Sequence, residues 1–452
     1  MVAAAAAAAA AVGWDPAAGA FAAAVAVSVL LAAWRPGLLV GALLAASAVD
    51  LVLVADLGGF TFRAAQVAGV ALAASAVARG GWRRWWAHLR SMPGLLPLAV
   101  LLLAAGARVA AGVPLRGKAV GYLAWAVFDV VVLAPAVAWH VRRAPLRALR
   151  TWWWGAATVA VFGLMQLALG VAGVDPPLVV QWNGARPRIN ALSYEPSYFA
   201  FQAMIPLALV FGVGLQRRLR VLHAVGAWVG PLLFAAIFLS SSRSGWLGLA
   251  VLCAVGAALL VAHPGPRRLD GPLPRVLATV AALAAPAAVF VPGHVVAADV
   301  ALARKATDLQ DISSTLPRRE GVLEALLLFR EQPLLGHGPG QFGAALLAHP
   351  ELKRRPPLPG DDDPHTLVTF NLYAELLAET GAVGTLAFLA ALWAVAARLF
   401  AARHRRALGA AALWPWLLMF GVMYQFNQTA WRTETWCLWG VAWALSPRRR
   451  AP

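Results

Sequence analysis

Length, composition and charge exclude an ordinary soluble protein. The chain has 452 residues, of which 61% are hydrophobic and only 13% are charged, whereas soluble globular domains are roughly 45–50% apolar and about 25% charged. A soluble fold of this length could not remove so much apolar surface from water. The composition therefore indicates a protein whose solvent is the lipid bilayer.

The net charge of +18 does not indicate a nucleic-acid partner, because the basic residues form no single patch. They stand in short clusters between apolar runs, as in the cytoplasmic loops of multi-pass membrane proteins. The two cysteines, Cys253 and Cys437, lie inside apolar segments and predict neither a disulfide nor a metal site.

Taken in chain order, many apolar segments approach the roughly 20 residues that a membrane helix needs. The candidate spans are residues 17–33, 37–56, 60–78, 93–111, 119–141, 151–173, 197–215, 221–240, 245–262, 275–292, 376–400, 408–426 and 431–446. Several are short or rich in alanine, so one of the first three need not cross completely. We predict an all-α, polytopic transmembrane bundle of about 12 helices.

Basic clusters recur after every second span and so set the orientation of the bundle. The clusters begin at Arg79, Arg142, Arg217, Arg267, Arg403 and Arg448. We expect these loops and the C-terminus to be cytoplasmic. Residues 174–196, the tight turn around Arg243 and residues 293–375 are then external, while the side of the N-terminus depends on the number of spans.

The segment 293–375 predicts a large external loop with short helices, between an N-terminal bundle (1–292) and C-terminal membrane helices (376–452). It contains an amphipathic helix at Pro317–Glu331 and a glycine-rich turn at Gly336–Phe342. A further helix is expected to begin near Thr366. So long a loop is uncommon unless it is functional.

The first candidate site precedes the span at 197, where Arg186, Arg188 and Glu195 face the external side. Basic residues are uncommon in external loops, so their presence here favours a functional role for them. The alternative is an ordinary interfacial loop.

The second candidate site is Arg243, at the membrane edge between two spans. A guanidinium group there can bind phosphate oxygens through two parallel hydrogen bonds. The alternative is that it reaches the lipid headgroups.

The third candidate site follows the external loop. His365 is a plausible general base at neutral pH, and Glu375 and Glu379 share one face of the following helix. The alternative is a loop histidine beside a polar helix end. The acidic triplet at 361–363 could attract a divalent cation, but adjacent carboxylates in a proline-rich loop are usually only solvated, and we expect no metal.

Three stretches carry a family resemblance: Ser242–Gly245, the run from Arg318 to Phe342, and Asn371–Gly384. In this order, over roughly residues 180–400, they resemble the O-antigen ligase/polymerase family of polytopic membrane glycosyltransferases. The resemblance implies a GT-C-like bundle whose active site faces the periplasm from the bacterial inner membrane. It also implies transfer of a glycan from undecaprenyl pyrophosphate to a sugar hydroxyl of an acceptor glycan or glycolipid. The partners would then be this donor, the acceptor and the membrane lipids. The reaction would need no nucleotide sugar, cofactor or metal.

The resemblance also implies roles for single residues. Arg243 corresponds to the family's arginine at the serine-arginine turn, and Arg186 or Arg188 to the arginine before the next span; both would bind pyrophosphate. Many members have a histidine directly before the asparagine of the third stretch, where this chain has Phe370. The base is therefore His365 or Glu195. Ligase and polymerase activity remain open, and the alternative function is a transporter or flippase.

Overall fold

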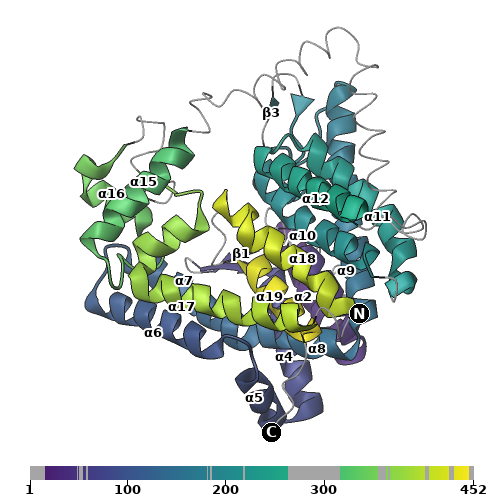
Figure 1. Ribbon diagram of the computed structural model, residues 1–452, viewed down its shortest axis with the longest axis horizontal. Coiled ribbons are helices and arrows are strands. Elements are labelled where there is room, and N and C mark those ends of the chain that lie inside the picture. The colour runs from purple at the N-terminus through teal and green to yellow at the C-terminus, as the bar shows by residue number, and fades with distance from the viewer. Residues whose placement is uncertain are drawn as a thin grey trace.

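The computed structural model describes residues 16–47, 49, 54–57, 60–180, 182–183, 186–216, 219–262, 316–354, 363–364, 367–402, 407–426 and 432–446. The chain forms a helical bundle with two short hairpins, so the predicted all-α membrane fold is confirmed (Figure 1). The helices are α2 (Pro16–Trp34), α3 (Pro36–Ala46), α4 (Ala64–Gly80), α5 (Trp82–Arg90), α6 (Leu95–Ala111), α7 (Arg116–Phe128), the π-helical turn η1 (Asp129–Leu133), α8 (Ala134–Arg143), α9 (Pro145–Val171), α10 (Pro196–Gly214), α11 (Arg220–Leu239), α12 (Arg243–Ala262), α15 (Leu316–Glu331), α16 (Phe342–Ala348), α17 (Leu372–Ala402), α18 (Ala407–Gly421) and α19 (Thr433–Leu445).

Within the described ranges, six helices are long and apolar enough to cross a membrane. A seventh span is added if α5 and α6, which meet at a bend of 90°, form one broken span. Shorter apolar helices, such as α3 and α4, complete the bundle. The expected number of about 12 helices stays a prediction, and the candidate span 275–292 and the domain boundary at 293 lie outside the described residues.

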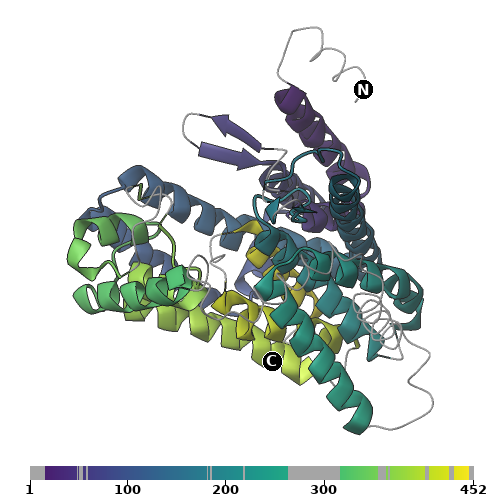
Figure 2. The same cartoon turned by 90° about the horizontal axis from the view of Figure 1, so that it is seen from above.

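The predicted span 37–56 is wrong as a continuous helix. Helix α3 ends at Ala46, and a hairpin follows in which β1 (Val54–Leu57) pairs with β2 (Phe60–Arg63). Two acidic residues, Asp50 and Asp56, interrupt this apolar run, and an uncompensated carboxylate in hydrocarbon is costly. The hairpin stands away from the main body of the bundle, next to α2 (Figure 2).

Small residues allow the closest helix crossings. A Cβ on Gly41 of α3 would lie 2.4 Å from Thr151 Cβ of α9, and a Cβ on Gly212 of α10 would lie 2.3 Å from the Ala411 carbonyl oxygen of α18. These helix pairs pack along much of their length. Because lipid and protein are equally apolar, such close packing is a main source of helix association in a membrane.

The helix predicted at Pro317–Glu331 is confirmed as α15, which forms a green pair with α16 beside α6 and α17 in Figure 1. The helix expected near Thr366 begins later, at Leu372. The Asn371 side chain determines that start, because its Oδ1 accepts hydrogen bonds from the amides of Tyr373 and Ala374, both at 3.0 Å. An asparagine in this position satisfies amides that a helix N-terminus leaves unpaired.

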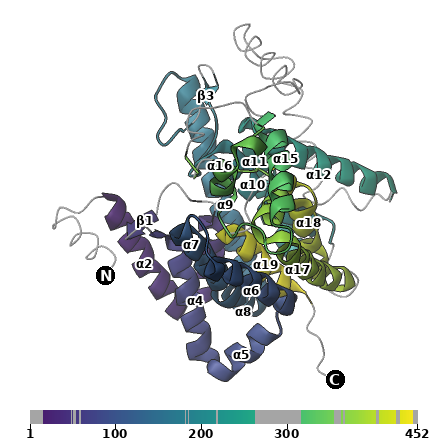
Figure 3. The same ribbon diagram turned by 90° about the vertical axis from the view of Figure 1, so that its left-hand side faces the viewer.

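The arginine-rich helix α5 and the hairpin of β3 (Trp182–Asn183) and β4 (Arg186–Pro187) lie at opposite ends of the molecule (Figures 1 and 3). This separation agrees with the orientation expected from the basic clusters, in which α5 is cytoplasmic and the hairpin external.

Candidate active site

Three arginines from separate parts of the chain converge at one place. Arg188 follows β4, Arg243 is the first residue of α12, and Arg318 lies in the first turn of α15. All three side chains are half-buried. Each of Arg188 and Arg318 interacts electrostatically with Arg243, and Arg318 also acts on Arg188. We call Arg188, Arg243 and Arg318 the guanidinium cluster.

The tight turn between α11 and α12 positions Arg243. Helix α11 ends at Leu239, and Ser241 takes a left-handed conformation (φ 57°) that reverses the chain. The Ser242 hydroxyl accepts a hydrogen bond from the Gly245 amide at 3.3 Å and so caps the start of α12. Arg188 is attached to the same turn, because its Nη2 donates to the Ser241 carbonyl oxygen at 3.1 Å.

Glu195 is the acidic partner of the cluster. It precedes α10 and accepts a hydrogen bond from the Ser197 hydroxyl at 2.8 Å. Its carboxylate interacts with both Arg188 and Arg318 and partly offsets the lowering of their pKa values by burial. Burial lowers the pKa of both guanidinium groups, and the neighbouring arginines lower it further. Three guanidinium groups close together present many hydrogen-bond donors, so the site favours an anion with several oxygens.

Two aromatic residues border the guanidinium cluster. The Arg318 guanidinium lies 5.4 Å from the centre of the Phe370 ring, and the Arg432 guanidinium lies 3.8 Å from the centre of the Tyr198 ring. Tyr198 also interacts electrostatically with Arg318. Position 370, where the resemblance implies a histidine, therefore lies beside the guanidinium cluster. Phe370 has a left-handed backbone (φ 54°), which is strained for a bulky residue.

The structure brings together Arg188, Arg243 and Glu195 of the residues predicted from the sequence. Arg186 belongs to strand β4, and its side chain is not among the described ones. His365 lies outside the described residues, as does most of the acidic triplet, of which Asp363 is described and exposed.

From the sequence, Arg318 belongs to the amphipathic helix and begins one of the stretches that carry the family resemblance, but it has no expected role in the site, and Arg432 is not among the candidate residues. A signal for Arg432 was present, because it stands directly before an apolar segment on the expected external side, the same charge argument that selected Arg188. The helical pattern of α15 contains no comparable signal for Arg318, because several of its charged residues fit the same polar face.

A glycine-rich turn attaches α15 and α16 to α17. The amides of His337 and Gly338 donate to the carbonyl oxygens of Ala378 (2.9 Å) and Glu379 (2.8 Å). In return, the Ala382 amide donates to the Pro333 carbonyl oxygen at 2.8 Å. Helix α17 kinks here, at Gly381. This backbone pairing, which we call the docking turn, holds α15 and hence Arg318 relative to the bundle.

The docking turn is expected to weaken in acid through His337. Burial lowers the pKa of its imidazole below the usual 6.5, although a hydrogen bond of 3.0 Å to the Leu328 carbonyl oxygen partly opposes the shift. The folded state then binds fewer protons than the unfolded chain, so stability is full above pH 6.5 and falls as the pH drops below it. The melting temperature should fall less for His337→Gln than for the wild type between pH values of about 7.5 and 5.5. An equal fall would contradict this role.

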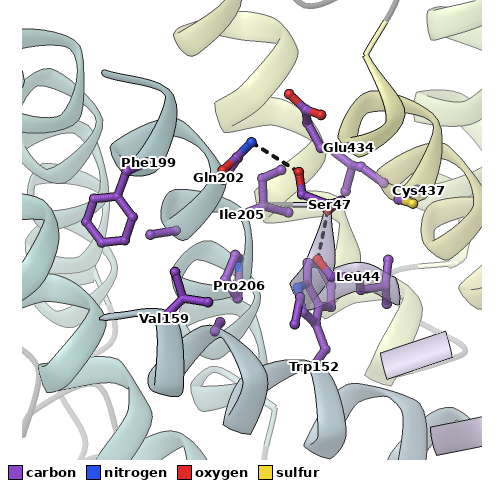
Figure 4. Close-up of a pocket in the computed structure, with 14 residues that line it drawn as sticks. Leu44, Ser47, Trp152, Val159, Phe199, Gln202, Ile205, Pro206, Glu434 and Cys437 are labelled. Carbon is purple, nitrogen blue, oxygen red and sulfur yellow. Dashed lines mark hydrogen bonds between the residues drawn. The ribbon is translucent and has the colours of Figure 1, made fainter. Parts of the chain in front are cut away.

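An inner pocket lies apart from the guanidinium cluster, between α3, α9, α10 and α19 (Figure 4). Most of its lining is apolar, with Gln202 and Glu434 among the polar exceptions. The Gln202 Nε2 donates to the Ser47 carbonyl oxygen at 3.1 Å. None of the residues that line this pocket belongs to the guanidinium cluster, so we assign it no catalytic role.

Residues 229–389 match a family model described as O-antigen ligase. This segment is similar to O-antigen ligases. A search of curated proteins found no match. The family match confirms the resemblance seen in the sequence and indicates a membrane glycosyltransferase of the O-antigen ligase and polymerase type. The matched segment includes Arg243, Arg318 and Phe370, whereas Arg188 and Glu195 precede it in the chain.

Proposed function

We propose that this protein transfers a glycan from undecaprenyl pyrophosphate to a hydroxyl group of an acceptor sugar during assembly of a surface polysaccharide. The observation that supports this function best is that Arg188, Arg243 and Arg318 lie close together, with Glu195 beside Arg188 and Arg318. A diphosphate presents oxygens on two phosphorus atoms, and several guanidinium forks can bind them together. We place the site on the periplasmic face of the inner membrane, where the lipid-linked donor would lie.

The proposed reaction is a displacement at the anomeric carbon. The acceptor oxygen forms the new glycosidic bond, the bond between the anomeric carbon and phosphate breaks, and the electron pair leaves with undecaprenyl pyrophosphate. Arg188, Arg243 and Arg318 stabilise the charge that develops on this leaving group. A base takes the proton of the acceptor hydroxyl, and His365 and Glu195 are the candidates.

The two candidate bases can be separated by mutation. His365→Ala should reduce transfer by about 100-fold or more if the imidazole takes the proton, because general base catalysis contributes roughly 10²–10⁴. Glu195→Gln keeps the hydrogen bond from Ser197 but removes the charge. A loss of that size in Glu195→Gln together with a mild effect of His365→Ala would assign the base to Glu195. Initial rates with a lipid-linked oligosaccharide provide the measurement.

Deletion of the gene, followed by gel analysis of the surface glycans, tests the function in cells. Loss of polysaccharide attachment to the glycolipid would indicate a ligase, and chains of a single repeat unit would indicate a polymerase. A surface glycan that is unchanged in both respects would contradict the proposed function. If unmodified donor instead accumulated at the cytoplasmic face, the result would support the alternative, a flippase.

A further inference from the structure

A second polar cluster adjoins the guanidinium cluster and has no role in the donor site described above. It consists of Lys118 and Tyr122 on α7 and Glu375 and Glu379 on α17. Both carboxylates interact electrostatically with Lys118 and with Tyr122. The Lys118 ammonium lies 6.0 Å from the centre of the Tyr122 ring.

Of these four groups, Glu379 is structural. It is 2% exposed, and its Oε1 accepts a hydrogen bond from the Phe342 amide at 3.3 Å, next to the docking turn. The other three side chains are half-buried. We call Lys118, Tyr122 and Glu375 the polar triad.

The polar triad has hydrogen-bonding capacity that the described part of the chain does not use. Glu375 accepts one long hydrogen bond, 3.5 Å from the Thr369 hydroxyl to its Oε2, and its Oε1 has no hydrogen-bond partner among the described residues. Within the same ranges, the Tyr122 hydroxyl and the Lys118 ammonium donate no hydrogen bond to a protein atom. The polar triad therefore offers two hydrogen-bond donors, Lys118 and Tyr122, and one acceptor, Glu375, close together at a half-buried site.

Arg432 and Tyr198 connect this place to the guanidinium cluster. Tyr122 interacts electrostatically with both of them, and the Arg432 guanidinium stacks over the Tyr198 ring. Tyr198 in turn interacts with Arg318. A molecule bound at the polar triad would therefore lie next to a diphosphate bound at the guanidinium cluster.

The chemistry of the triad suits a sugar better than a second phosphate. Glu375 and the nearby Glu379 bring no positive charge that would attract a phosphate group, whereas a carboxyl group exchanges hydrogen bonds with neighbouring sugar hydroxyls. A phenol and an ammonium group supply donors to sugar oxygens, and the Tyr122 ring offers an apolar face. We propose that Lys118, Tyr122 and Glu375 form the acceptor subsite, which binds the sugar whose hydroxyl attacks the donor. The inference rests on the proposed transfer reaction.

The test is Glu375→Gln in the full-length protein, assayed with lipid-linked donor while the acceptor concentration is varied. We expect the KM for the acceptor to rise about tenfold or more, because the amide group of glutamine cannot accept hydrogen bonds with both of its terminal atoms. The KM for the donor should not change. Tyr122→Phe should raise the acceptor KM less. Glu351→Gln is the matched control, because Glu351 is exposed and contacts His349.

Two outcomes would overturn the inference. One is an unchanged acceptor KM in Glu375→Gln. The other is a lower kcat with an altered pH profile at unchanged acceptor KM, which would make Glu375 a proton acceptor instead.

Direct binding separates failure of the subsite from failure of the proposed function. The probe is a fluorescent oligosaccharide released from the surface glycolipid of the deletion strain, added without donor. Binding by the wild type that is lost in Glu375→Gln supports the subsite even if the wild type transfers no glycan, and equal binding by both proteins contradicts it.

Discussion

Arg243→Lys is expected to reduce glycan transfer by about 100-fold or more, with little change in folding, because removal of one group that stabilises developing charge costs roughly 10²–10³ in rate. Lysine keeps the positive charge, but its ammonium cannot form the two parallel hydrogen bonds of a guanidinium fork. Arg243 is also held at the first turn of α12, where the helix dipole adds to the attraction for an anion. The measurement is kcat with a lipid-linked oligosaccharide donor, together with the melting temperature.

The matched control for this substitution is Arg330→Lys. Arg330 lies in the last turn of α15 and is exposed, so the same chemical change should leave transfer within a few-fold of the wild type. Full activity of Arg243→Lys would contradict pyrophosphate binding at the guanidinium cluster. A melting temperature that fell equally in both variants would instead point to a general effect of replacing arginine.

The second large effect is expected on stability, from Gly381→Ala. Gly381 has φ 63° and ψ −167° at the kink of α17, a region of backbone space that is essentially limited to glycine. A Cβ there would lie 2.3 Å from the Leu334 carbonyl oxygen. The strain alone costs about 1–3 kcal/mol, and relief of the clash must separate the docking turn from α17. We expect a clearly lower melting temperature and reduced transfer.

Gly106→Ala is the control for the glycine substitution. Gly106 lies inside α6, which packs against α17, and an added Cβ would meet Leu123 Cδ2 at an ordinary 3.7 Å. Alanine is the better helix former by about 1 kcal/mol, so this variant should be at least as stable as the wild type. If Gly381→Ala melted at the wild-type temperature, the docking turn would not be needed to hold α15.

The sequence alone determined that the protein is a membrane-embedded helical bundle, because only a bilayer accommodates so many apolar residues and because the backbone must then satisfy its own hydrogen bonds. It also identified the helix α15 and the candidate arginines Arg188 and Arg243, since charge next to hydrocarbon is costly unless it has a use. The family resemblance depended on short local motifs, which can be recognised in the amino-acid sequence itself.

Only the tertiary structure decided which of these residues meet. The position of Arg318 beside Arg188 and Arg243 depends on the docking turn, a backbone contact between residues more than 40 apart in the chain. The electrostatic interaction of Lys118 with Glu379 and Glu375 likewise connects α7 with α17. Hydrophobic periodicity fixes the buried face of a single helix, but it contains no information about which other helix lies opposite. Long-range packing and backbone hydrogen bonds make that choice, and so they determine the composition of the site.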